Sequence, residues 1–272
     1  MKKQLIFIVY TLFAFGIGAS AQTEPQTQTP TATQNSDAQD TPRYEVQLQY
    51  SQESLTRNFG TWRTASLYFE RKFSKRKIVW GTYRVSDRNS NRDQEVVGGF
   101  YKGFGRKWAA TGEAMFSPTH KYVGKFSVML EGERILGRGF VGHVGGRYTS
   151  YDTVKATTVY GLTEKYWGNN RAAYTLYITN LTNAGTAPTH RIQYNRYFGE
   201  NVNSVGTAVA FGREHENLGP NIGILRSKTW SVSGSARYWL TKNVGVNFDA
   251  VFQRQGDIYY RRGVNLGIRY RL

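Results

Sequence analysis

The chain contains 272 residues, and its 36 Lys and Arg against 19 Asp and Glu give a formal net charge of +17. The absence of cysteine excludes a disulfide framework and a thiolate metal site, and it is expected of an exported chain. A mean hydropathy of −0.54, with 29 glycines and 15% aromatic residues, argues against a helical membrane protein.

The first residues have the composition of an export signal. Lys2 and Lys3 precede an apolar core, Leu5–Gly18, and small residues end the segment at Ala19–Ala21. This pattern predicts a secretory signal peptide over residues 1–21, cleaved before Gln22. A spanning anchor helix is the weaker alternative, because the apolar run is too short.

Residues 22–42 are rich in Gln, Thr, Pro, Asn and Asp and have almost no bulky apolar side chain. Such a segment cannot bury enough surface to fold, and it is predicted to be a disordered leader or tether. No further change of composition divides residues 43–272, which are therefore predicted to be one domain. After residue 21 no apolar run reaches the length of a transmembrane helix, so a closed barrel is the remaining way to span a bilayer.

Apolar and polar residues alternate along many short segments of this domain. Val244, Val246 and Phe248, for example, alternate with Gly245 and Asn247. Successive side chains of a strand point to opposite faces, so each segment is predicted to be a strand with one apolar face. The segments are about ten residues long, which is the length that a tilted strand needs to cross a bilayer.

A short turn recurs down the chain, each time as a basic or aromatic residue, a bulky residue and then a cluster of Gly, Ser, Lys, Arg or Asn. The bulky residues that mark the copies are Phe73, Phe104, Leu136, Trp167, Phe198 and Trp239. Most intervals between them are 31 or 32 residues, which fits two membrane-crossing strands, a turn and a loop. Each repeat unit is therefore a hairpin.

The pattern predicts an all-β fold, a transmembrane antiparallel up-and-down β-barrel of about 14 strands, with 12 or 16 as alternatives. The predicted strands are 44–53, 61–72, 77–86, 94–103, 107–116, 121–133, 139–149, 154–165, 171–180, 189–198, 204–214, 228–239, 243–253 and 261–272. The recurring turns join alternate strands, which places both termini on the short-turn, periplasmic rim. The opposite rim is predicted to carry the longer loops, namely His215–Ser227, Asp87–Asp93, Leu181–Pro188, Ser54–Gly60 and Arg254–Tyr260.

Aromatic residues gather at the short turns, where a membrane interface favours rings with one wet end. We predict an aromatic girdle that includes Phe73, Trp108, Trp167, Phe198 and Trp239, together with Tyr68, Phe69, Phe104, Tyr166, Tyr197 and Tyr238. A soluble barrel or sandwich core is the alternative interpretation, but it would not place aromatics at every second turn.

If the apolar set faces lipid, the polar set faces the lumen. Its candidates for lining a pore are Arg84, His143, Arg147, Arg191, Arg237, Arg269, Glu131 and Glu133. The wider set is Glu45, Gln47, Gln49, Glu70, Glu113, Lys125, Gln193, Asn195, Asn247, Asp249, Asn265 and Arg271. These residues predict either an ion-pair lattice that stiffens or plugs the interior, or a polar channel with a charged constriction.

The chain resembles a known family. The hairpin Tyr194–Asn201, Tyr-x-Arg-Tyr-Phe-Gly-Glu-Asn, and the ending Arg261–Leu272 are similar to those of YaiO outer-membrane β-barrel proteins. The resemblance covers about residues 43–272 and implies a place in the outer membrane of a Gram-negative envelope. No activity or catalytic residue comes with it. The last residue, Leu272, with Tyr270 two positions before it, is a weaker form of the C-terminal signal that the barrel-assembly machinery reads.

The basic residues lie in every turn and do not form a single stripe, which argues against nucleic-acid binding. A basic rim suits outer-membrane lipids, an anionic envelope polymer or a periplasmic protein as partners. The plainer interpretation is that the long basic side chains simply extend their charged ends to the membrane interface.

The sequence offers little for catalysis. None of the four histidines has the Ser pairing of a lipid-modifying hydrolase, and we expect no metal and no cofactor. His215 with Glu214 and Glu216 is a weak metal candidate. His143 with Glu131 or Glu133 is the one acid–base pair that merits a test.

Taken together, the sequence predicts an outer-membrane barrel that acts as a passive or partner-gated channel for polar or anionic solutes. A structural barrel that docks an envelope or polysaccharide apparatus is the second hypothesis, and a lipid-modifying enzyme is the third.

Overall fold

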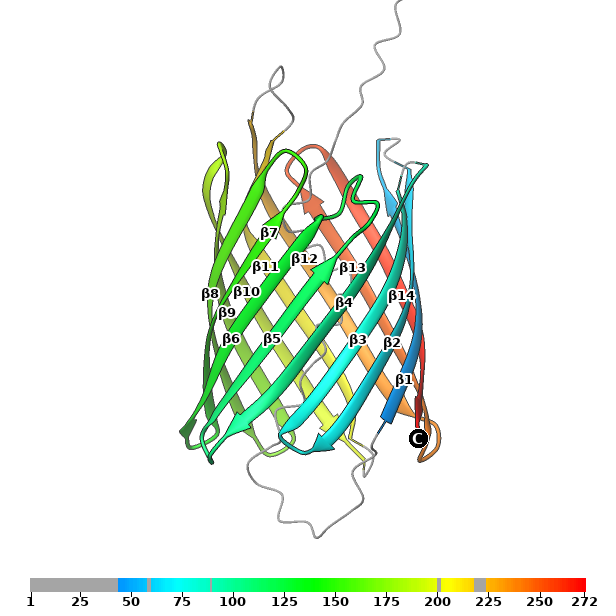
Figure 1. Ribbon diagram of the computed structural model, residues 1–272, viewed down its shortest axis with the longest axis vertical. Helices are drawn as coiled ribbons and strands as arrows, with labels where there is room; N and C mark the ends of the chain where they lie inside the picture. The colour runs from blue at the N-terminus through cyan, green and yellow to red at the C-terminus, as the bar shows by residue number, and fades with distance from the viewer. Residues whose placement is uncertain (1–43, 58–59, 89, 200–201, 218–223) are drawn as a thin grey trace, which may run out of the picture.

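In the computed structural model the chain forms one closed barrel of fourteen antiparallel strands, and each strand pairs with its neighbours in sequence (Figure 1). The prediction of about 14 strands is confirmed. The structure describes residues 44–57, 60–88, 90–199, 202–217 and 224–272, with side chains left out at 215–226. The predicted signal peptide and leader lie outside the described residues. No helix in the described ranges has the length and apolarity needed to cross a membrane.

The strands are β1 (Tyr44–Leu55), β2 (Thr61–Ser74), β3 (Lys77–Arg88), β4 (Asn91–Phe104), β5 (Trp108–Phe116), β6 (Phe126–Gly137), β7 (Phe140–Ser150), β8 (Lys155–Trp167), β9 (Asn170–Leu181), β10 (Gly185–Phe198), β11 (Asn203–Asn217), β12 (Ile224–Trp239), β13 (Val244–Gln255) and β14 (Tyr259–Arg271).

Alternation along each strand separates an outer face from an inner face. On β14, Leu266 and Ile268 are 59% and 60% exposed, whereas the intervening Asn265 is 5% exposed. A closed barrel has only these two faces, so the exposed apolar set contacts lipid and the buried polar set faces the lumen. The barrel closes where β1 pairs with β14, from Glu45 opposite Arg271 to Leu55 opposite Arg261.

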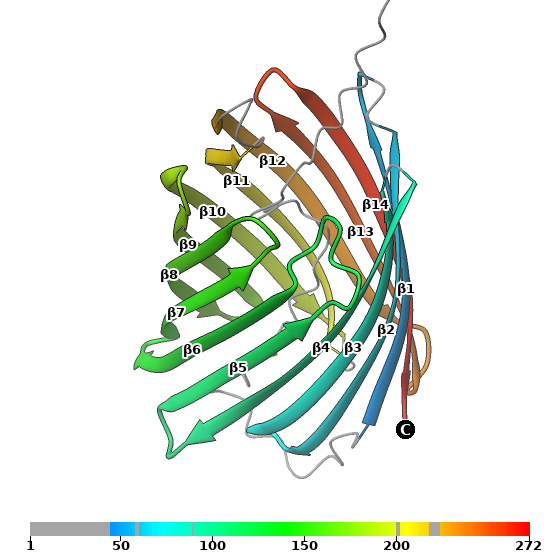
Figure 2. The ribbon, with the colours of Figure 1, turned by 45° about the horizontal axis from the view of Figure 1, so that its top comes forward.

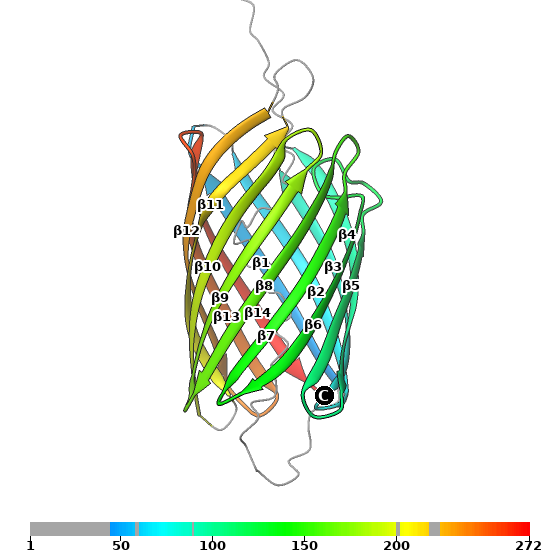
Figure 3. The same cartoon turned by 90° about the vertical axis from the view of Figure 1, so that its left-hand side faces the viewer.

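The two rims differ. The C-terminus and the start of β1 lie at one rim with the recurring turns, and the remaining connections lie at the other (Figures 1 and 3). Barrels of this kind place their termini and short turns in the periplasm, so the opposite rim is extracellular.

Most predicted loops are shorter than expected because the strands continue beyond the apolar core of the membrane. The predicted loop Leu181–Pro188, for example, is a turn of residues 182–184 between β9 and β10. The connection between β5 and β6 departs in the other direction. The predicted strand 121–133 begins only at Phe126, and residues 117–125 form a loop.

Candidate functional site

The candidate site is the lumen with its extracellular mouth. All eight predicted pore-lining residues occupy inner-face positions on β3, β6, β7, β10, β12 and β14, namely Arg84, Glu131, Glu133, His143, Arg147, Arg191, Arg237 and Arg269.

Three of the predicted arginines form ion pairs with carboxylates of other strands. Arg84 Nη1 lies 3.1 Å from Glu95 Oε2 on β4. Arg147 Nη2 lies 3.0 Å from Glu113 Oε1 on β5. Arg269 pairs with Glu45 across the seam between β14 and β1. These pairs neutralise much of the basic character that the arginines alone suggested.

The other two arginines differ. Arg191, on β10, forms no ion pair or hydrogen bond with any residue that the structure describes. It is therefore the predicted lumenal cation whose charge stays available to a solute. Arg237, on β12, lies opposite Asn247 of β13, and Asp249 is the next inward residue of that strand.

His143 belongs to a lattice on the inner wall. Its Nδ1 lies 2.9 Å from Glu131 Oε1, while Nε2 lies 3.7 Å from Glu164 Oε2, too far for a hydrogen bond. The Tyr160 hydroxyl donates to Glu131 at 2.8 Å, and Arg171 Nε donates to Glu164 at 2.9 Å. The histidine and glutamates face the lumen, away from lipid, so this geometry suits a structural lattice better than chemistry on lipids.

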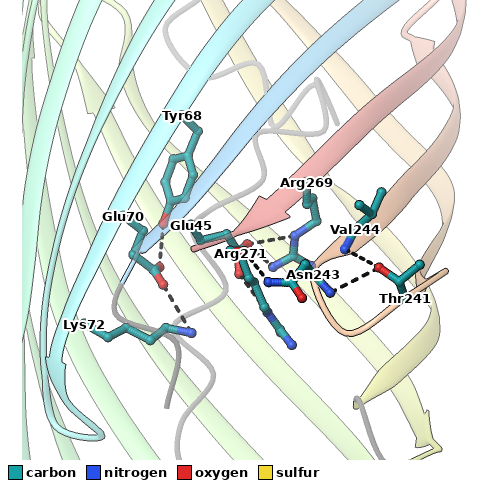
Figure 4. Close-up of polar contacts among 9 residues, drawn as sticks. All are labelled: Glu45, Tyr68, Glu70, Lys72, Thr241, Asn243, Val244, Arg269 and Arg271. Atoms are coloured by element: carbon teal, nitrogen blue, oxygen red, sulfur yellow. Dashed lines mark hydrogen bonds and ion pairs between the residues drawn. The ribbon is translucent and has the colours of Figure 1, made fainter. Parts of the chain in front are cut away.

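A second lattice closes the barrel near the periplasmic rim (Figure 4). Glu45 on β1 accepts a hydrogen bond from Arg269 Nε at 2.8 Å and lies 3.4 Å from Arg271 Nε. On β2, Glu70 accepts from the Tyr68 hydroxyl at 2.7 Å and pairs with Lys72 at 3.2 Å.

Trp239 corrects part of the predicted girdle. It is 4% exposed on the inner face, with the Arg271 guanidinium 3.4 Å from its ring centroid. Its neighbour Tyr238, 50% exposed, takes the outward position instead. The prediction was wrong because two adjacent residues of one strand cannot both face lipid. For the same reason Tyr68, Tyr166 and Tyr197, each next to an outward aromatic, point inward.

The remaining girdle residues Phe73, Trp108, Trp167 and Phe198 are exposed on the outer face near the short turns. Several carry a cation over the ring. The Arg71 guanidinium lies 4.4 Å from the Phe73 centroid, and that of Arg134 lies 4.8 Å from the Trp108 centroid. A ring with a charged group above it suits the boundary between acyl chains and headgroups.

Large inward side chains lie against glycines on the neighbouring strand. A Cβ at Gly99 would stand 2.3 Å from the Trp80 ring, and one at Gly145 would stand 2.4 Å from the Tyr160 ring. Both are directly opposite pairs. The same arrangement joins Asn195 with Gly206, Trp239 with Gly245, Glu53 with Gly263 and Gln49 with Gly267. These side chains therefore lie along the wall instead of projecting across the lumen.

The extracellular mouth contains a loop contact that the sequence did not reveal. Asp93, fully buried at an inward position of β4, accepts hydrogen bonds from the backbone amides of Lys121, Tyr122 and Val123 at 2.8–3.1 Å. Because the carboxylate faces the lumen, the loop 117–125 folds onto the inner side of β4. Figure 2 shows this connection between β5 and β6 from above the rim.

Further contacts hold the loop to β3, to β4 and to the turn after β7. Thr119 Oγ1 accepts from the Gln94 amide at 2.8 Å, and His120 Nε2 lies 3.0 Å from Asp152 beyond β7. The Tyr122 hydroxyl donates to the Ser86 carbonyl. Burial raises the pKa of Tyr122, with Arg88 opposing, so the hydroxyl keeps the proton that this bond requires.

Tyr122 completes a stack of side chains on the inner wall at the extracellular rim. The Arg88 guanidinium lies 4.4 Å from the Trp62 ring centroid and 4.8 Å from that of Tyr122. On the other side of Trp62, Arg261 Nη1 lies 3.4 Å from Glu53 Oε2. We name Trp62, Arg88 and Tyr122 the mouth stack. No sequence motif marks it, because Asp93 precedes the loop that it holds by more than twenty residues.

Among the described residues no group of three or more His, Asp or Glu is arranged to hold a metal ion. The loop proposed as a weak metal candidate, around His215, has no described side chain at that residue.

A closed fourteen-stranded barrel with an apolar outer face, short turns on one rim and a polar lumen defines an outer-membrane β-barrel protein. The sequence matches the model of the YaiO membrane beta barrel domain over residues 43–217, well over half of its length. The chain belongs to the YaiO family, as its motifs had indicated.

Several solved structures share this fold. The CymD monoaromatic hydrocarbon channel matches with a TM-score of 0.62 and 10% identity, over 95% of this chain and 94% of that chain. A bacterial polysaccharide outer membrane secretin matches with a TM-score of 0.55 and 11% identity, over 86% and 100%. At these identities the likeness shows the fold alone. No curated protein matches the sequence.

Proposed function

We propose that the protein is a narrow outer-membrane channel for small polar solutes, with a modest preference for anions. The observation that carries the proposal is the pairing of large inward side chains with glycines, because it keeps bulky groups against the wall. Solved barrels of this fold include a hydrocarbon channel. That likeness supports transport of a solute through the barrel, but it does not indicate which solute.

The loop 117–125, at the extracellular mouth, supplies the constriction that such a channel needs. Loop 117–125 bends into the lumen, and Asp93 fixes three successive amides of it. Selectivity in pores follows from the width and the charge of the narrowest part. The mouth stack therefore sets the size limit, and Arg191 supplies the unpaired positive charge below it.

The experiment is conductance of the refolded mature chain, residues 22–272, in planar bilayers. Asp93→Ala frees the loop and should give single-channel steps roughly twofold larger than those of the native protein. Asp87→Asn is the matched control, since Asp87 pairs with Arg92 outside the lumen. Silence of both the native barrel and Asp93→Ala, with folding verified by heat-modifiable gel mobility, would overturn the proposal.

Ion preference is tested in the same bilayers under a salt gradient. Arg191→Gln should move the reversal potential toward the value for no preference. Arg196→Gln is the control, because Arg196 lies on the same strand with its side chain exposed on the outer face. An unchanged reversal potential in Arg191→Gln would contradict the assigned preference.

One observation favours a second candidate, a barrel that docks an anionic envelope polymer at its periplasmic rim. The outward cations there are Arg71, Lys75, Lys77, Lys102, Arg106, Lys107, Arg134, Arg138, Lys165, Arg196 and Lys242. Within the described part of that rim no Asp or Glu side chain faces outward, because Glu45, Glu70 and Glu164 all point into the lumen.

Sedimentation with alginate tests this candidate. Salt-sensitive binding that Lys75→Gln with Lys107→Gln weakens, and that Lys155→Gln on the extracellular rim leaves intact, would support docking. Equal binding by all three proteins would remove it.

A further inference from the structure

A small cavity opens at the extracellular rim between two turns that are distant in sequence. It has a volume of about 160 Å³ and is lined by Arg57, Arg254, Gly256, Asp257, Tyr259 and Tyr260. Two hydrogen bonds join the turns beside it, from the Thr56 amide to the Tyr260 carbonyl at 3.0 Å and from the Tyr260 amide to the Thr56 hydroxyl, Oγ1, at 2.9 Å. The cavity is therefore a built part of the β1–β14 seam, and Tyr259 of its lining packs against Trp62 of the mouth stack, with ring centroids 6.4 Å apart.

Its polar lining carries more positive than negative charge. Arg254 Nη2 binds Asp257 at 2.6 Å and Nε donates to the Gly256 carbonyl at 2.8 Å, so this arginine shapes the β13–β14 turn. Arg57 forms no ion pair or hydrogen bond with the described residues. Lys228 is exposed next to the cavity, since its carbonyl accepts the Gly256 amide at 2.9 Å. The neighbouring Arg262 is also exposed on β14. An anion bound between Arg57, Lys228 and Arg262 would neutralise these positive charges.

Arg57 is held in a strained conformation. Its φ is +59°, in the left-handed region that a long side chain rarely adopts. Such a conformation persists where the surrounding structure holds it. The two hydrogen bonds between Thr56 and Tyr260 hold the turn beside Arg57.

An apolar track leads from the cavity down the lipid face. Tyr260 lies with its ring centroid 5.8 Å from that of Phe252, which lies 5.5 Å from that of Trp230. The Arg262 guanidinium lies 5.8 Å from the Phe252 centroid. Outward Val264 and Leu266 continue the track on β14. A polar, cationic cavity above an aromatic and aliphatic track is complementary to an amphiphile with an anionic head.

We propose that this cavity and track bind the phosphorylated sugar head and the acyl chains of an outer-leaflet glycolipid. The extracellular position selects the lipid, because the rim opposite the termini meets the outer leaflet. Arg57 lines the cavity together with two tyrosines, and Lys228 and Arg262 are exposed beside it. This set suits a phosphate on a saccharide, which accepts both charge-assisted and neutral hydrogen bonds.

The test is native mass spectrometry of the full mature barrel with diphosphorylated lipid A, with the same lipid after enzymatic dephosphorylation, and with phosphatidylglycerol. We expect one tight site for diphosphorylated lipid A and at least roughly tenfold weaker binding of the other two, since each charged hydrogen bond is worth about that factor. Arg57→Gln and Arg262→Gln should each weaken the tight site by a similar factor. Arg196→Gln, at the periplasmic rim, should leave it unchanged.

Arg57→Gly separates binding from folding. Glycine accepts the positive φ, so this variant should unfold at the same or a higher urea concentration than the native barrel while it loses tight lipid binding. Native affinity in Arg57→Gly and Arg57→Gln, or equal affinity for phosphatidylglycerol and lipid A, would overturn the proposal. Binding of free glucosamine phosphate as tight as that of lipid A would also overturn it, because the track would then contribute nothing.

Discussion

Glycines on the inner face determine how far the large lumenal side chains extend toward the axis. Gly99→Ala places a methyl group 2.3 Å from the Trp80 ring, closer than any real contact, so the ring must swing away from the wall. We expect single-channel conductance to fall by roughly 20–50%, in line with a narrower lumen. Gly98→Ala is the control, because a Cβ there meets nothing within 4 Å and faces outward. Equal conductance in the two variants would contradict the role given to Gly99.

Glu164 holds the Arg171 end of the His143 lattice. It is 2% exposed and accepts hydrogen bonds from Arg171 and from the Tyr166 hydroxyl. Glu164→Ala leaves Arg171 on the inner wall without its carboxylate, which should lower the free energy of unfolding by about 3 kcal/mol. Urea unfolding in detergent measures the loss. The double variant Glu164→Ala/Arg171→Met should recover part of it, and a double variant as unstable as the single one would show that the pair is not the cause.

At the scale of elements, the strands follow from local sequence and the mouth does not. Alternation is a property of each strand by itself, so Val244–Gln255 could be recognised without knowledge of its partners. The loop 117–125 could not be recognised in this way, because it depends on a distant residue. Asp93, more than twenty residues away, accepts hydrogen bonds from three of its backbone amides. The sequence pattern of residues 121–125 continues that of β6, and only the contact with β4 ends the strand.

The orientation of adjacent aromatics was a second limit of the sequence. Tyr238 and Trp239 are both suited to an interface, and the turn motif alone does not say which of them faces lipid. The strand phase decides it, since Trp239 lies opposite Gly245 and shares the inner face with Arg269. Alternation counted back from the turn would have separated the two residues.

The hydrogen bond from the Tyr122 hydroxyl to the Ser86 carbonyl, which holds loop 117–125, should respond to alkaline pH. Burial raises the pKa of Tyr122, so the latched loop keeps this proton at a pH where an exposed tyrosine, with a pKa of about 10, loses it. The Tyr122 hydrogen bond therefore contributes fully below about pH 10, and its contribution is lost progressively as the pH rises from there toward the raised pKa of the bound tyrosine. We expect conductance to rise above pH 10 in the native protein. Tyr122→Phe, which has no hydroxyl to titrate, should not show this rise, and a rise of equal size in that variant would assign the effect to other groups.

At the scale of the whole molecule, the net charge of +17 is distributed unevenly. Carboxylates concentrate in the lumen, where Glu45, Glu95, Glu113 and Glu164 each neutralise an arginine. The excess cations are left on the rims, at the level of lipid headgroups. The charge of the sequence therefore describes the surface of the barrel more than its interior, which is why composition alone overstated the basic character of the lumen.

Closure of the barrel depends on the seam between β1 and β14, the two strands that are farthest apart in sequence. Glu45 of β1 holds both Arg269 and Arg271 of β14, and Trp239 covers the two guanidinium groups at 4.9 and 3.4 Å from its ring centroid. Removal of the carboxylate leaves two like charges side by side on the inner wall. Glu45→Ala should therefore lower the free energy of unfolding by about 3 kcal/mol, seen as an earlier urea midpoint.

Glu70→Ala is the comparison that assigns this loss to closure. Glu70 is also an inward acid near the periplasmic rim, but its partners Tyr68 and Lys72 lie on its own strand, so its removal leaves the seam intact. We expect the Glu45 variant alone to lose its heat-modifiable, closed form at a lower temperature on gels. An equal shift in both variants would mean that lumenal acids stabilise the wall wherever they lie, and that the seam has no special part in holding the barrel closed.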